Sequence, residues 1–463
     1  MIKDMTTGSP VKRILAFCAP LLVGNLFQQL YNLADSILVG RILGVNAFAA
    51  VGSTGAINFL ILGFALGICS GFVIPIAQSF GAGDGDEARR RAGQLVWLAL
   101  AFSLLVTLVA ALWTDDILRI TQTPEEIFDE AYRYIHIVFL GAGATILYNL
   151  ASGVLRALGD SKTPLYFLMG AVSVNIALDL LFMKGTGMGV EGAAYATVLS
   201  QFFAGAACVL YIYRRVPMLR LTRDDWRPDR RRMRLIVGIG VPMGLQFSIT
   251  AIGSIMVQSA VNDLGTAAVA AVSAASKAHM VVSAPLDSCG VAMATYCGQN
   301  LGSKNLARIR KGMSAVTVMC FAYCAAAFAF NYYFGSAVAS FFTDGAEAGI
   351  LANAHRYLTL NGAAYPMLAV IFIYRNGLQG MGFSRQAMGA GLAELAARAF
   401  VAFGLVGQFG FLAVCWANPA AWLLADALLL TLYHTELRAL DRRWAAEARE
   451  RCESAVSVRL RHV

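Results

Sequence analysis

Apolar residues dominate this chain in runs of about 20, the length that a helix needs to cross roughly 30 Å of hydrocarbon. The short alternating segments typical of a membrane barrel are missing. The pattern therefore predicts an all-α polytopic membrane protein with twelve transmembrane helices, which we place at 14–40, 46–78, 92–113, 131–155, 165–183, 190–212, 235–261, 266–297, 312–338, 356–380, 387–409 and 412–434.

The two halves of the chain repeat one another. The segment LGVNAFAAV at 43–51 recurs as LGTAAVAAV at 264–272. Farther on, QSFG at 78–81 recurs as QNLG at 299–302, and LRALGDSK at 155–162 corresponds to LQGMGFSR in the second half. Three repeats in the same order indicate a duplication.

Each half contains six predicted spans, an even number, so both halves enter and leave the membrane on the same side. We therefore expect two six-helix bundles related by a pseudo-two-fold axis along the membrane normal, as in many secondary transporters. The predicted divisions are an N-terminal lobe at 1–213, a basic cytoplasmic linker at 214–234, a C-terminal lobe at 235–436 and a cytoplasmic tail at 437–463.

Composition and charge agree with this class and set the orientation. The chain has 463 residues, is 58% hydrophobic and only 14% charged, whereas soluble proteins carry about 25% charged residues. Most of its Lys and Arg lie in the loops that share a side with both termini, so the positive-inside rule makes both termini cytoplasmic in a multi-pass protein of the plasma (inner) membrane. The net charge of +9 follows from this topology.

We expect contacts with membrane lipids and small organic molecules, no nucleic acid, no obligatory protein partner and a monomeric state.

The chain offers little for metal or covalent chemistry. Its nine cysteines lie mostly within apolar spans, where cysteine behaves as a small hydrophobic residue, and its five histidines are dispersed. The sequence therefore predicts no cofactor, no metal site and no enzymatic activity.

A few polar residues occur within the spans, where an ionisable side chain usually marks a pathway or a coupling site. Asp35 lies in the first span, Asn175 and Asp179 in the fifth, and Thr197 in the sixth. At 1.5 Å per residue, Asp35, Asp179 and Thr197 all lie roughly 8–9 Å from the outer ends of their spans, with Asn175 one turn deeper. Three helices thus bring oxygen-bearing side chains to one level, where they suit a proton or a small hard cation such as Na⁺. The alternative is that they only cap a loop and tie helices together.

The second half differs chemically. It carries Lys277 near the middle of one span, and Glu394 with Arg398 four residues apart in another. Glu394 and Arg398 form a neutral structural pair in one interpretation. In the other, Lys277 or Glu394 contributes to substrate binding or a proton relay.

Pro20 and its counterpart Pro242 interrupt helix hydrogen bonding, and Pro20 is a candidate hinge that links charge at Asp35 to bending.

Several motifs together resemble the multidrug and toxic compound extrusion (MATE) family along nearly the whole chain. They are PLLVGN at 20–25 with DSILVGR at 35–41, LRALGD at 155–160, GMGVEGAA at 187–194 and CGQNLG at 297–302. The resemblance implies export of organic, often cationic compounds in exchange for H⁺ or Na⁺. It also implies a first-lobe cation site at Asp35, Asn175, Asp179 and Thr197, joined by Tyr134, with Pro20 as the residue linked to bending.

The chain departs from one branch of that family, which carries acidic residues in spans 7 and 10. The corresponding positions are Thr250 and about Leu368, neither of them acidic, so a coupling site in the second lobe is left open.

The resulting hypothesis is a multidrug efflux antiporter that works by alternating access, with H⁺ or Na⁺ as coupling ion. Its substrate cavity is expected between the lobes, with candidate residues Gln28, Gln29, Tyr31, Asn32, Gln246, Lys277 and Glu394. The alternative is a flippase of lipid-linked saccharides from the related superfamily, which tends to bring several cations to its cavity. A membrane-embedded enzyme is a third class, for which the chain shows no nucleophile–base or metal arrangement.

Overall fold

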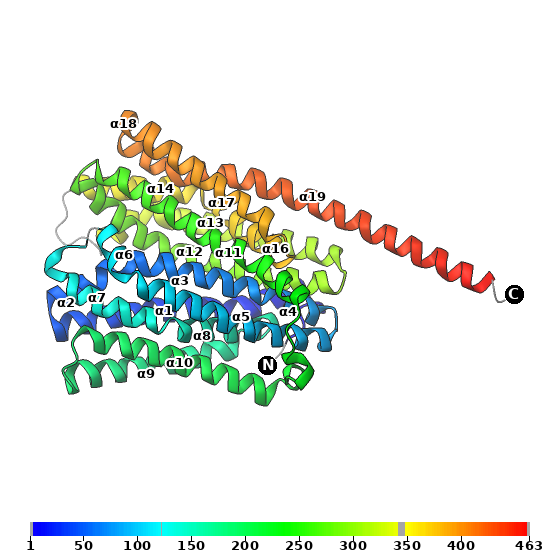
Figure 1. The fold of residues 1–463 in the computed structure, drawn as a ribbon. Coiled ribbons are helices and arrows are strands. Elements are labelled where there is room, and N and C mark those ends of the chain that lie inside the picture. The colour runs from blue at the N-terminus through cyan, green and yellow to red at the C-terminus, as the bar shows by residue number, and fades with distance from the viewer. Residues whose placement is uncertain (1–2, 122, 341–347, 461–463) are drawn as a thin grey trace.

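The computed structural model describes residues 3–121, 123–340 and 348–460, and this part of the chain is almost entirely helical, with no strand. Ten of its helices are long and apolar enough to span a membrane alone, and two further spans are helix pairs bent by 45° and 53°. This confirms the all-α class and the twelve spans. Figure 1 shows helices of the first half (blue to green) on one side of the bundle and helices of the second half (green to orange) on the other.

The first half contains spans formed by single helices and by groups of shorter ones. Its elements are α1 (Pro10–Leu43), α2 (Val45–Ser53), α3 (Gly55–Phe72), α4 (Ile74–Gly81), α5 (Gly85–Leu112), α6 (Thr114–Ile120), α7 (Glu125–Leu140), α8 (Ala142–Ala157), α9 (Lys162–Asp179), the π-helical segment η1 (Leu180–Gly185) and α10 (Val190–Arg215).

The second half follows after two short 3₁₀ segments, η2 (Pro217–Leu219) and η3 (Arg223–Trp226). Its elements are α11 (Arg230–Asn262), α12 (Thr266–Gly302), α13 (Leu306–Ser340), α14 (Ala348–Ala363), α15 (Tyr365–Val370), η4 (Ile371–Arg375), α16 (Asn376–Gly380), α17 (Ser384–Ala399), η5 (Phe400–Leu405), α18 (Val406–Phe409) and α19 (Phe411–Leu460). The last helix continues without a break to Leu460, well into the segment that the sequence assigns to a tail.

The three π-helical segments adjoin charged residues inside the bundle. Asp179 directly precedes η1, Arg375 ends η4, and Arg398 lies two residues before η5. A π-helical turn widens the helix locally and leaves its hydrogen-bond ladder irregular, and such turns are frequent at functional sites. The irregular turns therefore lie next to three of the charged residues of the spans.

The repeated glutamine–glycine motif holds the two lobes together at the end of the bundle where both termini lie, hereafter the termini face. α4 and α12 cross so closely that a Cβ at Gly81 would overlap the backbone oxygen of Gln299, and a Cβ at Gly302 that of Gln78. The two glutamines reach the opposite lobe: Gln78 Nε2 donates to Gly380 O at 3.1 Å, and Gln299 Nε2 to Ala157 O at 2.8 Å. Ala157 and Gly380 are themselves matching positions of the repeat, so the duplication builds a symmetric closure.

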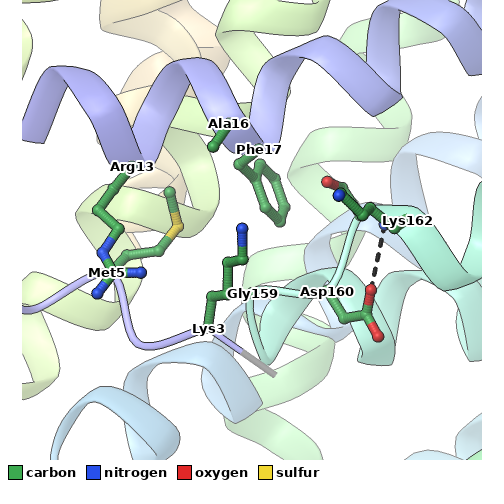
Figure 2. A pocket seen from close by; sticks show the side chains of 9 residues that line it. Lys3, Met5, Arg13, Ala16, Phe17, Gly159, Asp160 and Lys162 are labelled. Atoms are coloured by element: carbon green, nitrogen blue, oxygen red, sulfur yellow. Dashed lines mark hydrogen bonds between the residues drawn. The ribbon is translucent and has the colours of Figure 1, made fainter. Parts of the chain in front are cut away.

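The N-terminal segment strengthens the same closure. Met5 N donates to Gln299 Oε1 at 2.9 Å, while the Arg308 guanidinium donates to the backbone oxygens of Met5, Thr7 and Gly8. Figure 2 shows Lys3 beside Gly159, at the start of the loop in which Asp160 Oδ1 accepts a hydrogen bond from Lys162 N at 3.1 Å. This segment thus links the end of α8 to the start of α13 in the other lobe.

The basic linker between the lobes is anchored to α5. Asp225, only 3% exposed, accepts from Arg89 Nε at 2.8 Å and from Thr222, and Gln94 Nε2 donates to Arg227 O at 2.9 Å. Burial alone would raise the pKa of Asp225, but the hydrogen bonds from Thr222 and Arg89 outweigh it and lower that pKa. The linker is therefore packed against the first lobe along this stretch.

We predict that Gly81→Ala destabilises the closed termini face, because the added methyl group has no room beside Gln299. Overpacking of this kind costs about 1–3 kcal/mol, which should lower the midpoint of thermal unfolding in detergent. The matched control is Gly389→Ala, since nothing lies within 4 Å of a Cβ at that helical position. Equal midpoints for Gly81→Ala and wild type would contradict the tight crossing.

Candidate functional site

Two carboxylates meet inside the first lobe. Asp35 comes from α1 and Asp179 from the end of α9, and the two side chains are close enough to interact directly. Asp35 is 8% exposed and Asp179 is 0% exposed, and Asn175, one turn earlier on α9, is fully buried as well. The structure thus brings the sequence-predicted acidic pair and its amide neighbour into one buried place.

Hydroxyl groups surround the pair. Tyr31 Oη lies 3.2 Å from Thr197 Oγ1, which connects α1 to α10. Tyr31 and Tyr134 both lie within electrostatic range of the two carboxylates. Tyr31, which the sequence suggests only as a cavity residue, is therefore part of the acidic cluster, together with the predicted Thr197 and Tyr134.

Several polar atoms of this cluster have no hydrogen-bond partner among the described residues. They are Asp35 Oδ1, both carboxylate oxygens of Asp179, and both side-chain atoms of Asn175. Buried polar atoms are normally satisfied, and carboxylate, amide and hydroxyl oxygens are the ligands that a small hard cation prefers. These oxygen atoms therefore suit the binding of a proton or a sodium ion. They do not form a hydrogen-bond network in which each polar atom is already satisfied.

A cavity of about 750 Å³ adjoins the cluster and is lined entirely by first-lobe residues. Asp35, Tyr134 and Thr197 line it, whereas Asn175 and Asp179 do not. Of the predicted substrate residues, Gln28, Tyr31 and Asn32 line the cavity, and Pro20 does so nearer the termini face. Gln201, four residues after Thr197 on α10, also lines it and was missed, although this spacing places it on the same helix face.

The remaining predicted substrate residues lie outside this cavity. Gln29 Nε2 contacts Met280 Sδ of the other lobe at 2.9 Å, and Lys277 lies on an exposed part of α12. Gln246 is buried and contacts the Gln379 amide. A substrate cavity between the lobes stays a prediction, because the cavity described here belongs to the first lobe.

Glu394 lies between two arginines in the second lobe. Its carboxylate oxygens are 3.4 Å from Arg375 and 3.7 Å from Arg398, so the predicted Glu394–Arg398 pair is present and is joined by a second cation. Gln246, with its amide oxygen turned toward Arg375, accepts from that guanidinium at 2.8 Å and 3.0 Å. Arg398 also donates to Thr250 O at 3.4 Å. The arrangement matches the structural interpretation of the pair.

Three charged residues of the bundle were missed by sequence reasoning. Asp287 of α12 accepts from Asn25 Nδ2 of α1 at 3.2 Å and so joins the lobes, and Asp426 of α19 is buried near Glu394. Both lie inside predicted spans and a complete scan for acidic residues would have found them. Arg156 directly follows the predicted span 131–155 and was not singled out as a site residue, yet it lines the first-lobe cavity.

Twelve spans in two packed lobes, with a carboxylate-lined cavity in one of them, define a multi-pass membrane transporter. The chain belongs to the MatE family, whose model matches residues 20–181 and 242–424. Members of this family are transporters and not enzymes.

Individual relatives and structures agree with this assignment. The chain is 30% identical to the "Probable multidrug resistance protein YpnP" of Bacillus subtilis (strain 168) over 81% of this chain and 83% of that protein. It is 31% identical to "Probable multidrug resistance protein YoeA" of the same organism, over 64% and 65% respectively. Its fold matches the crystal structure of MATE in the bent conformation with a TM-score of 0.87 at 24% identity, covering 95% of this chain and 98% of that one.

We predict that Glu394→Gln destabilises the protein strongly, because it leaves the Arg375 and Arg398 guanidinium groups without their shared carboxylate. Removing one member of a buried charge network costs about 3–5 kcal/mol. The matched control is Asp115→Asn, which breaks the exposed Asp115–Arg119 pair on α6, where the expected loss is below about 1 kcal/mol. Thermal unfolding in detergent compares them, and similar midpoints for the two variants would show that the network contributes little.

Proposed function

We propose that the protein is a secondary active antiporter that exports organic, often cationic compounds in exchange for H⁺ or Na⁺. The observation that carries this proposal is the Asp35–Asp179 pair, buried in one lobe beside a cavity large enough for a drug-sized molecule. The names of the relatives, which describe multidrug resistance and multidrug export, support the choice of substrate.

The coupling chemistry follows from the repulsion between two carboxylates in a place with little water. Both charges together are unfavourable unless a cation neutralises one of them. A proton shared by the pair, or a sodium ion held with Asn175 and Thr197, meets this need. A cationic substrate in the cavity meets it too, because Asp35 lines that cavity. Ion and substrate therefore compete for the same negative charge, which is the basis for exchange.

The closed termini face supports an orientation for this exchange. Most basic loops lie on that side, so the positive-inside rule makes it cytoplasmic, with the protein in the cell's inner membrane. The Gly81–Gln299 and Gly302–Gln78 crossings then close the protein toward the cytoplasm. Pro20 interrupts α1 between this closure and Asp35, and we assign it the role of hinge by which neutralisation of Asp35 changes the shape of the cavity.

We predict that Asp35→Asn abolishes ion-driven efflux, because the amide keeps the shape of the side chain but removes its charge. The measurement is efflux of ethidium from proteoliposomes under a pH gradient and, separately, under a sodium gradient. In wild type, the gradient that drives efflux identifies the coupling ion. Asp115→Asn, at an exposed site outside the cavity, is the control and should transport at the wild-type rate.

Full gradient-driven efflux in the Asp35→Asn variant would contradict the coupling site. Absence of ethidium efflux from folded wild-type protein under both gradients would contradict the proposed substrate class and direct attention to lipid-linked substrates.

A further inference from the structure

The first-lobe cavity extends from the acidic cluster almost to the termini face. Asp35 and Pro20 both line it, and the 15 residues between them correspond to about 22 Å along the axis of α1. Near the termini face the cavity is lined by Arg156, in the last turn of α8, and by Ser161, which directly precedes α9. A cation at the Asp35–Asp179 pair therefore has open space for most of the way to the termini face.

A second, much smaller pocket continues from this end of the cavity. Ser161 lines both, so the two adjoin there. The small pocket has a volume of about 10 Å³, close to what one water molecule needs, and Figure 2 shows it between α1 and the loop that carries Asp160. Its charged lining residues are Lys3, Arg13, Lys162 and Asp160. Asp160 is engaged at the start of α9, where its oxygens accept hydrogen bonds from Lys162 N and from Thr163 N and Oγ1. The continuation toward the termini face thus carries an excess of positive charge.

Arg156 contributes the first positive charge that a cation in the cavity would meet. Among the described residues it forms no ion pair, and the titratable groups near its guanidinium are Tyr148, Cys69 and Cys208. The buried arginines of the second lobe differ, because both pair with Glu394. In a place with little water, a charge that no carboxylate offsets repels other cations strongly.

The matching position of the second lobe shows that the fold itself does not require a cation there. The repeat aligns Arg156 with Gln379, a neutral residue whose amide contacts Gln246. The charge is therefore a feature of the lobe that carries the acidic pair, and its explanation lies in what that lobe does.

We propose that Arg156 is an electrostatic barrier that stops the coupling cation from crossing the first-lobe cavity to the cytoplasm while the termini face is closed. This inference rests on the proposed exchange for H⁺ or Na⁺ and adds how that exchange avoids a leak. An arginine in a narrow pathway excludes cations and protons in this way. The barrier is needed because an ion that crosses without substrate dissipates the gradient that drives export.

The test measures ion leak in the absence of any substrate. Proteoliposomes receive a pH gradient or a sodium gradient, and its decay is followed with an internal pH-sensitive dye or with radioactive sodium. We expect the gradient of the coupling ion to decay about tenfold faster or more in Arg156→Gln than in wild type, because a unit charge a few ångströms from the path changes the crossing rate by at least that factor. Arg156→Met, a second neutral variant of similar length, should leak equally, whereas Arg156→Lys should hold the gradient.

The control is Arg119→Gln, an exposed arginine of α6 outside the cavity, which should hold both gradients as wild type does. Decay at the wild-type rate for both ions in folded Arg156→Gln and Arg156→Met, with folding read from thermal unfolding in detergent, would overturn the inference. A chloride leak that rises together with the cation leak, or an equal leak in Arg156→Lys, would show a structural hole and also overturn it.

Ethidium efflux by wild type, measured in the same vesicles, tests the proposed function separately. A leak specific to cations in the neutral variants, without ethidium efflux in wild type, would support the barrier and contradict the proposed substrate class. Ethidium efflux without any such leak would support export and overturn the barrier.

Discussion

The proximity of two carboxylates within a membrane-embedded lobe is the constraint on which the rest of this structure depends. Asp35 and Asp179 come from helices far apart in the sequence, and they meet because α1 and α9 pack side by side. Like charges in a medium of low dielectric repel strongly, so the surrounding protein must either neutralise them or leave them available to a cation. The hydroxyls of Tyr31, Tyr134 and Thr197 and the unpartnered amide of Asn175 favour the second outcome.

The two lobes share one arrangement of helices but differ in whether their buried charged groups form ion pairs. In the second lobe Glu394 lies between Arg375 and Arg398 and pairs with both, and the Gln246 amide oxygen accepts from Arg375. In the first lobe the acidic pair and Arg156 form no ion pair among the described residues, and Asp35 and Arg156 line a cavity. The duplicated QSFG and QNLG motifs, by contrast, play equivalent parts in closing the termini face. Duplication thus preserved the closure, while the interiors diverged into a structural lobe and a lobe suited to ligands.

The sequence was most informative for features that a single length determines, such as the depth of a residue in a span or the presence of a span. Rise per residue from the span ends placed Asp35, Asp179 and Thr197 at one depth, and the structure brings these residues together. Spans were predictable because an apolar run of the right length has few alternatives. The bends after Leu140 and Ala363 were not, since they depend on packing: a Cβ at Gly141, for example, would overlap Val198 of α10. Arg156 was missed because it directly follows the predicted span end at residue 155, and the sequence does not show which way a long side chain extends.

Competition between ion and substrate at equilibrium tests the central claim most directly. The measurement is ethidium binding to the purified protein by fluorescence, across pH and across Na⁺ concentration, for wild type and Asp179→Asn. Our account predicts that binding to wild type weakens as the coupling ion increases, and that this dependence is greatly reduced in Asp179→Asn. Ethidium affinity that is independent of both pH and Na⁺ in wild type would contradict the account, because the carboxylate pair would then not be shared between ion and substrate.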